Sequence, residues 1–248
     1  MYDDVAVDAW IQDDPDPVTR AELTELLSAA RSHGEQAQAA RRALSDAFSG
    51  TLAFGTAGLR GRLGGGPNRM NRVVVIRAAA GLSAYLKDRL GEGFSVAIGY
   101  DARHNSKRFA LDTAAVVTGS GGRAILSESH CPTPVLAFAL RRLEADAGVM
   151  VTASHNPPQD NGYKVYLGGS VVTGDGQGVQ IVPPFDAEIA AAIEATPPAD
   201  QVPMNDDLVE AVDPRDEYVA EAVKLSSGDA ASRADRRIVL AAMHGVGA

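Results

Sequence analysis

The feature that most constrains the fold is an alternation of short apolar segments with longer helical patterns between residues 73 and 195. Predicted helices cover residues 73–90, 106–118, 134–143 and 184–195, and predicted strands cover residues 95–100, 123–126 and 147–152. Two further apolar runs, residues 163–167 and 170–172, predict a hairpin. Strands that alternate with helices are typical of a layered α/β sheet, and a hairpin adds an antiparallel edge. We therefore predict a mixed, mostly parallel sheet with helices on both faces.

A helical arm is predicted for residues 1–50, ahead of the α/β pattern. Leucine and alanine recur at helical intervals after Thr19 and Glu22, which have the spacing of a capping box. Gly34 interrupts this pattern, so we expect two helices in the arm. Residues 51–200 are then assigned to the α/β domain.

Residues 201–248 are predicted to be a linker followed by the start of a truncated second domain. Proline and acidic residues dominate residues 196–216, as in many interdomain linkers. A helix near residues 217–225 and a strand over residues 237–243 follow. Because one helix and one strand cannot bury a core, we expect this chain to be the incomplete N-terminal part of a longer protein.

The charge balance excludes some classes of partner. The 248 residues include 23 basic and 32 acidic side chains, which argues against a nucleic-acid or anionic-membrane surface. No apolar run approaches the roughly 18 residues of a membrane span, and the N-terminus is acidic where a signal peptide is basic. Cys131 is the only cysteine, so a disulfide framework is excluded and a small buried side chain is expected. We expect a cytoplasmic protein whose local cations can still bind a small anion.

The densest polar segment is TASHNPPQDNGYKVY, residues 152–166, which begins at the end of the strand predicted over residues 147–152. Ligands of open α/β sheets bind beyond the carboxyl ends of strands, so Ser154 is placed as a site residue. Pro157 and Pro158 stiffen the loop, because a residue that precedes proline is driven to extended backbone. The alternative is a surface turn, since Asn, Pro, Asp and Gly all favour turns.

The sequence around Ser154 favours a phosphoryl carrier over a hydrolase nucleophile. The G-x-S-x-G elbow is absent, and neighbouring side chains on extended backbone point apart, so His155 is expected to be a poor base for Ser154. His155 and Lys164 are nearby cations that could surround an anion or move a proton.

A second constellation, FGTAGLRG, spans residues 54–61. Its glycines would allow backbone to approach a ligand closely, and Arg60 could grip phosphate oxygens with its planar guanidinium. The alternative is a flexible glycine loop with a solvated arginine. No strand is predicted before it, so a dinucleotide fingerprint is unsupported. Residues 118–122, TGSGG, are expected to form a helix C-cap turn.

A third segment, GYDARHNS, follows the predicted strand at residues 95–100. Asp101 and Arg103 are expected to pair and brace the loops, and Asn105 or Ser106 to cap the next helix. His33, His104 and His130 are expected to be structural or solvated, and His244 has no assigned role.

In their order along the chain, the segments FGTAGLRG, GYDARHNS and TASHNPPQDNGYK resemble the α-D-phosphohexomutase family, which contains the phosphoglucomutases and phosphomannomutases. The resemblance implies that Ser154 carries a phosphoryl group bound to Mg²⁺ and exchanges it with a hexose phosphate through a hexose 1,6-bisphosphate. It further implies proton transfer by Lys164, an acid/base or phosphate-binding role for His155, and contact of Arg60 with the phosphoserine region. The implied activity moves phosphate between the 1- and 6-positions of the sugar.

The family's metal loop, Gly-Asp-x-Asp-Arg, does not occur in these 248 residues. Without its carboxylates Mg²⁺ would have few oxygen ligands, so we expect this chain alone to have little or no mutase activity. The alternatives are a non-catalytic module that binds phosphosugar and a phosphopentomutase. The sugar itself is left open, because the family's specificity loop is also missing.

Overall fold

The computed structural model describes residues 2–226 and 237–247. Its α-helices are α1 Asp4–Asp13, α2 Pro17–Ala30, α3 Glu35–Ala47, α4 Arg72–Leu90, α5 Ser106–Gly119, α6 Thr133–Arg142, α7 Phe185–Glu194 and α8 Arg215–Lys224. Its strands are β1 Leu59–Arg62, β2 Ser95–Tyr100, β3 Arg123–Ser127, β4 Ala147–Val151, β5 Asp160–Leu167, β6 Val179–Gln180 and β7 Glu210–Val212. Short 3₁₀ turns cover Gly174–Gly176 and Ala199–Gln201.

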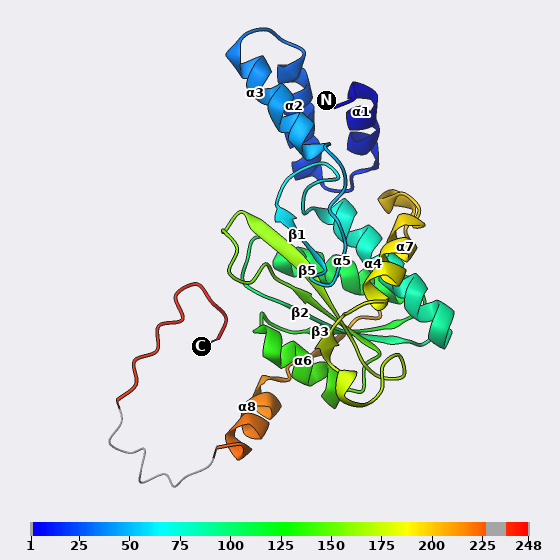
Figure 1. The fold of residues 1–248 in the computed structure, drawn as a ribbon, viewed down its shortest axis with the longest axis vertical. Coiled ribbons are helices and arrows are strands. Elements are labelled where there is room, and N and C mark those ends of the chain that lie inside the picture. The colour runs from blue at the N-terminus through cyan, green and yellow to red at the C-terminus, as the bar shows by residue number, and fades with distance from the viewer. Residues whose placement is uncertain (1, 227–236, 248) are drawn as a thin grey trace.

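In the described residues the strands form one seven-stranded sheet in the order β1-β5-β4-β2-β3-β7, with β6 paired to β5. Strands β4, β2, β3 and β7 are parallel, whereas β5 runs antiparallel to β4, β1 and β6. Helix α6 packs on one face, while α4, α5 and α7 form the layer on the other (Figure 1). The predicted mixed, mostly parallel sheet with helices on both faces is confirmed.

Strand β2 shows why this sheet is buried on both faces. Val96, Ile98 and Tyr100 belong to the core cluster that includes residues of α4 and α5, and Ala97 packs with the cluster under α6. A strand covered on both sides has an almost continuous apolar sequence, which is the pattern that predicts β2. Gly99 lies against Cys131, which is buried as expected.

The arm contains three helices where two were expected. Helix α1 occupies the acidic segment before Pro15, and its Val7, Trp10 and Ile11 contribute to the arm's own apolar cluster. Their i, i+3, i+4 spacing is the signal for this helix in the sequence. Figure 1 shows the arm standing at one end of the α/β domain.

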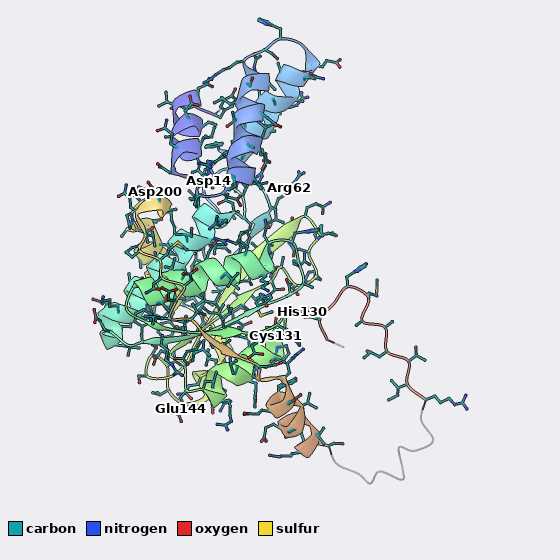
Figure 2. All side chains as sticks on the ribbon, turned by 180° about the vertical axis from the view of Figure 1, so that it is seen from behind. Asp14, Arg62, His130, Cys131, Glu144 and Asp200 are labelled. Carbon is teal, nitrogen blue, oxygen red and sulfur yellow. The ribbon has the colours of Figure 1, made fainter. Side chains whose placement is uncertain are left out.

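The prediction of a capping box formed by Thr19 and Glu22 at the start of α2 is also wrong. The helix begins at Pro17 with Asp16 as its N-cap, and the Thr19 hydroxyl instead donates to Asp14 at 2.6 Å. Glu22 accepts from the amide of Gly65 at 3.1 Å, so it ties the arm to the domain. Asp14 lies where the two parts meet (Figure 2), and its burial raises the pKa of this carboxyl.

Two predicted strands are not observed. Residues 170–172 form a turn, because the amides of Val171 and Val172 both donate to the carbonyl of Gly168. The next strand in the chain that pairs with β5 is β6 instead. Residues 237–243 are described but not as a strand, and Ile238 and Val239 are 88% and 95% exposed. A strand needs a neighbour to satisfy its backbone groups, and none pairs with this segment in the described part of the chain.

The expected linker supplies a strand of the sheet. Within residues 196–216, β7 pairs in parallel with β3, and Arg123 on β3 binds Glu210 on β7 with two hydrogen bonds of 2.7 Å. The sheet therefore extends past residue 200. None of the helices in the described residues combines the length and apolarity that crossing a bilayer requires.

A candidate phosphoryl-transfer site at the carboxyl ends of β4 and β2

The polar loop that contains Ser154 follows β4, and the segment that contains Asp101 follows β2. The two strands are parallel neighbours, with Tyr100 opposite Val151, so their carboxyl ends bring the two loops together. A cavity of about 700 Å³ opens there, and Ser154 and Asp101 are among the residues that line it. Ser154 therefore lies at the edge of the sheet where ligands of α/β proteins bind, as its place after an apolar strand predicts.

Ser154 has a backbone conformation that only a minority of non-glycine residues adopt. Its φ is +56°, in the left-handed region, which costs about 1–2 kcal/mol for a residue with a Cβ. The Ser154 amide donates to Thr152 Oγ1 at 2.9 Å, and that hydroxyl donates to Asp101 Oδ2 at 2.6 Å. The side chains of Thr152 and Asp101 therefore hold Ser154 in place through its backbone amide.

The left-handed turn changes the relation between Ser154 and His155. Extended backbone was expected to point their side chains apart, but Ser154 Oγ and His155 Nδ1 lie 3.5 Å from each other. This separation is at the long limit of a hydrogen bond. The expectation that these two side chains point apart is therefore wrong, because the positive φ turns the serine out of the extended conformation.

Asp101 and Arg103 brace the loop as expected. Arg103 Nε lies 3.5 Å from Asp101 Oδ2, and both side chains are largely buried. The expected helix cap is different. Asn105 occupies the N-cap position of α5 without a side-chain cap bond, while Ser106 Oγ donates to Asp101 Oδ1 at 2.7 Å. Ser106 thus fixes the carboxylate oxygen of Asp101 that Arg103 Nε does not face.

Arg60 and Lys164 lie on the neighbouring antiparallel strands β1 and β5. The glycine segment was expected to be a loop, but Arg60 lies on β1, where it pairs opposite Gly162 of β5. Its Nη1 donates to Asn156 Oδ1 at 3.4 Å, and its buried Nε has no hydrogen-bond partner among the described residues. Burial, with a smaller contribution from the Arg60 charge, lowers the pKa of Lys164.

The four predicted site residues therefore form two pairs. Ser154 contacts His155, and the positive charge of Arg60 contributes, after burial, to the lowered pKa of Lys164. Asn156 links them, because it follows Ser154 in the loop and accepts from Arg60. Ser154 lines the cavity, whereas Arg60, His155 and Lys164 are not among its lining residues.

Several polar residues of the loop were missed as site residues, although they lie in the segment that the sequence singles out. Asn156 was considered only as the residue before a proline, yet its Nδ2 donates to Asp160 Oδ2 at 2.8 Å. Asn161 is fully buried and donates to the His104 carbonyl and to Ser106 Oγ. The unusual density of short polar side chains was the only signal for this network.

The described residues do not form a metal site by themselves. No group of three or more His, Cys, Asp or Glu side chains in residues 2–226 and 237–247 is arranged to hold an ion. Asp101 is already bonded to Thr152 and Ser106, and Asp160 to Asn156. An octahedral Mg²⁺ would need oxygen ligands beyond these.

Comparison with known proteins agrees with this fold. The sequence model of phosphoglucomutase/phosphomannomutase, alpha/beta/alpha domain I, matches residues 51–199, more than half of the chain. The chain therefore belongs to the phosphoglucomutase/phosphomannomutase family, and the resemblance drawn from its three motifs is confirmed.

Relatives with several names match the chain. A Haemophilus influenzae protein named "Probable phosphomannomutase" is 47% identical over 187 residues, which are 72% of this chain and 36% of that protein. The phosphoribomutase of Saccharomyces cerevisiae is 38% identical over 192 residues, 76% of this chain and 28% of the relative. A crystal structure of a Thermus thermophilus protein, classed as a phosphomannomutase, aligns with a TM-score of 0.59 and 30% identity over 71% of this chain and 36% of that one. The chain thus spans about a third of the length of these relatives.

Proposed function

We propose that this chain is the phosphoserine-bearing domain of a phosphosugar mutase of the phosphomannomutase/phosphoglucomutase type. Ser154 would carry a phosphoryl group between the 1- and 6-positions of a hexose phosphate, with a hexose 1,6-bisphosphate as intermediate. The observation that carries this proposal is Ser154 itself, held at φ +56° at the end of β4 and lining a cavity of about 700 Å³. Family membership supports the reaction class.

The transfer step needs one bond formed, one broken and a proton moved. Ser154 Oγ bonds to a phosphorus of the bisphosphate while the bond from that phosphorus to the sugar oxygen breaks. The proton of Ser154 goes to a base, and a proton returns to the sugar oxygen. His155, 3.5 Å from Ser154 Oγ, is the nearest candidate for the first proton.

Lys164 and Arg60 have different parts in this proposal. The lowered pKa of Lys164 enlarges its neutral fraction, so the amine can exchange protons with a sugar hydroxyl more readily than an exposed lysine. The Arg60 guanidinium already touches the serine loop through Asn156, so it can offset the charge of a phosphoserine.

The proposal includes Mg²⁺, but most of the oxygen ligands of this ion would have to come from outside the described residues. A phosphoryl group on Ser154 would supply one ligand, and no cluster of acidic side chains stands ready in the part of the chain that the structure describes. We therefore expect the isolated chain to bind Mg²⁺ weakly and to convert hexose phosphate at a low rate.

Phosphoryl uptake tests the proposal directly. Incubation of the 248-residue chain with glucose 1,6-bisphosphate and Mg²⁺ should add one phosphoryl group, seen in the intact mass and mapped to Ser154. Ser154→Ala should abolish the uptake, whereas Ser170→Ala, which changes an exposed serine, should leave it intact. Absence of uptake by the wild-type chain would favour the alternative, a phosphosugar-binding module without transfer chemistry.

The names of two relatives favour a second substrate class. The Saccharomyces cerevisiae phosphoribomutase and a mouse phosphopentomutase are 38% and 34% identical to this chain. A pentose bisphosphate is therefore the second donor to test. Faster labelling of Ser154 by ribose 1,5-bisphosphate than by glucose 1,6-bisphosphate would identify a phosphopentomutase.

Replacement of Lys164 separates its chemical part from its effect on stability. Lys164→Met should slow the labelling of Ser154 by about 100-fold, a typical contribution of a general acid or base. It should also raise the melting temperature at pH 7, because burial opposes the charged form in the folded chain. The folded pKa lies below the unfolded one, so the unfolded chain binds more protons between them, and the wild type gains stability as pH rises through that alkaline window.

The melting experiment includes a matched control. Lys107→Met changes an exposed lysine and should leave the melting temperature and its pH dependence almost unaltered. Equal melting curves for the two variants would contradict the burial of Lys164, and unchanged labelling would remove it from the proposed chemistry.

A further inference from the structure

One arginine binds the backbone of the serine loop at four points. The guanidinium of Arg103 donates to four carbonyl oxygens at 2.7–3.0 Å, with Nη1 bonded to Pro157 and Asp160 and Nη2 bonded to Ser154 and Asn156. Three of these carbonyls belong to the turn that connects β4 to β5, and the fourth belongs to Asp160, the first residue of β5. A single side chain therefore fixes the path of the whole loop.

The Ser154 residue is held on both of its backbone groups. Its amide donates to Thr152 Oγ1 at 2.9 Å, and its carbonyl accepts from Arg103 at 2.7 Å. Both anchors lead to Asp101, which accepts from Thr152 and lies 3.5 Å from Arg103 Nε. The left-handed φ of +56° is unfavourable for a serine on its own, so the surrounding contacts must maintain it.

We infer that Arg103 is a positioning residue, which sets the rate of phosphoryl transfer by holding Ser154 in the left-handed conformation that presents its Oγ to the cavity. The effect of Arg103 on the transfer rate rests on the proposed function. Its effect on the conformation of the loop does not. A small misplacement of a reacting atom can cost about 100-fold in rate.

The geometry separates positioning from substrate binding. Each of the terminal nitrogens of Arg103 has two carbonyl partners, and Nε faces Asp101. Because the four carbonyls take up the N–H groups of both terminal nitrogens and Nε faces a carboxylate, no N–H group of Arg103 is left for a phosphate. Arg103 therefore acts through the loop, although its side chain lines the cavity.

Lysine cannot replace this arrangement. An ammonium group has three donors that radiate from one point, whereas the planar fork of arginine places two donors on each of two nitrogens. Arg103→Lys keeps the charge and loses the spacing of the four bonds. It is therefore the variant that separates the effect of charge from that of geometry.

The test measures the labelling of Ser154 by glucose 1,6-bisphosphate in Arg103→Ala and Arg103→Lys at a series of donor concentrations. The maximal rate should fall by about 100-fold in both variants, while the half-saturating donor concentration changes less than about twofold. Added guanidinium should restore much of the rate of Arg103→Ala, and ethylammonium should not. Arg42→Ala, at an exposed arginine of the arm, should behave as the wild type.

Amide hydrogen exchange over residues 152–161 gives a readout that needs no transfer. Exchange there should accelerate by about tenfold or more in both Arg103 variants and should slow again with guanidinium in Arg103→Ala. Unchanged exchange, or a raised half-saturating concentration with an unchanged maximal rate, would overturn the inference. If the wild type takes up no phosphate, the proposed function fails, and the exchange data still decide the role of Arg103.

Discussion

Replacing Asp112 with alanine should lower the free energy of unfolding by about 3–5 kcal/mol, the usual result of removing one partner of a buried ion pair. The Asp112 side chain is fully buried on α5, where Arg72 of α4 binds it with two hydrogen bonds of 2.7 and 2.9 Å. Arg108 adds a third contact at 2.9 Å. Without the carboxylate, the largely buried Arg72 loses its compensating charge.

The effect should extend to the arm, because Arg72 also donates to the carbonyl of Pro15 at 3.3 Å. Urea unfolding followed by circular dichroism measures the loss, and exchange of the α1 and α2 amides should rise with it. Asp88→Ala, at an exposed aspartate of α4, is the matched control and should change stability by less than about 0.5 kcal/mol. A loss below about 1 kcal/mol in Asp112→Ala would show that the ion pair does not hold α4 and α5 together.

Replacing Gly58 with alanine should destabilise the chain by about 2–5 kcal/mol, the sum of an overpacking cost and backbone strain. A Cβ at Gly58 would overlap the carbonyl oxygen of Tyr163 on β5 and lie 2.9 Å from its carbonyl carbon. The φ of +70° adds about 1–2 kcal/mol of left-handed strain to the overpacking cost of about 1–3 kcal/mol. The neighbour is backbone, so it cannot move without separating β1 from β5.

Because β1 carries Arg60 next to Lys164, the Gly58 variant should also label poorly at Ser154. Thermal and urea unfolding measure the stability, and the intact-mass assay measures the labelling. Gly55→Ala is the control in the same segment, since a Cβ there meets nothing within 4 Å and the φ of Gly55 is not positive. Equal stability of the two variants would contradict the close approach of β1 to β5.

Patterns of burial made most of the α/β layer predictable. Strand β2 was predicted with its observed bounds, residues 95–100, because a continuous apolar run is typical of a strand in a sheet that is covered on both faces. Helix α4 was predicted within one residue of its observed bounds, because its apolar pattern is too long for a strand. Short edge strands carried no such signal. β1 contains Leu59, Arg60, Gly61 and Arg62, and only its pairing with β5 makes it a strand.

The candidate site was predictable in its location and less so in its geometry. The position of Ser154 after an apolar strand and the bracing by Arg103 follow from the sequence of the segments. The contact of Ser154 with His155 does not, because it depends on a positive φ that local sequence rules assign to glycine or asparagine rather than to serine. Long-range contacts impose that conformation.

The sequence by itself determined the α/β class, the arm's helical character and the segments that carry polar chemistry, since these depend on periodicity and on residue type. Only the tertiary structure decided which segments meet. Arg60 and Asn156 are 96 residues apart, and Arg103 reaches the Ser154 carbonyl across 51 residues. Contacts over such distances arise from strand order, and strand order is set by the packing of the whole sheet rather than by any local pattern.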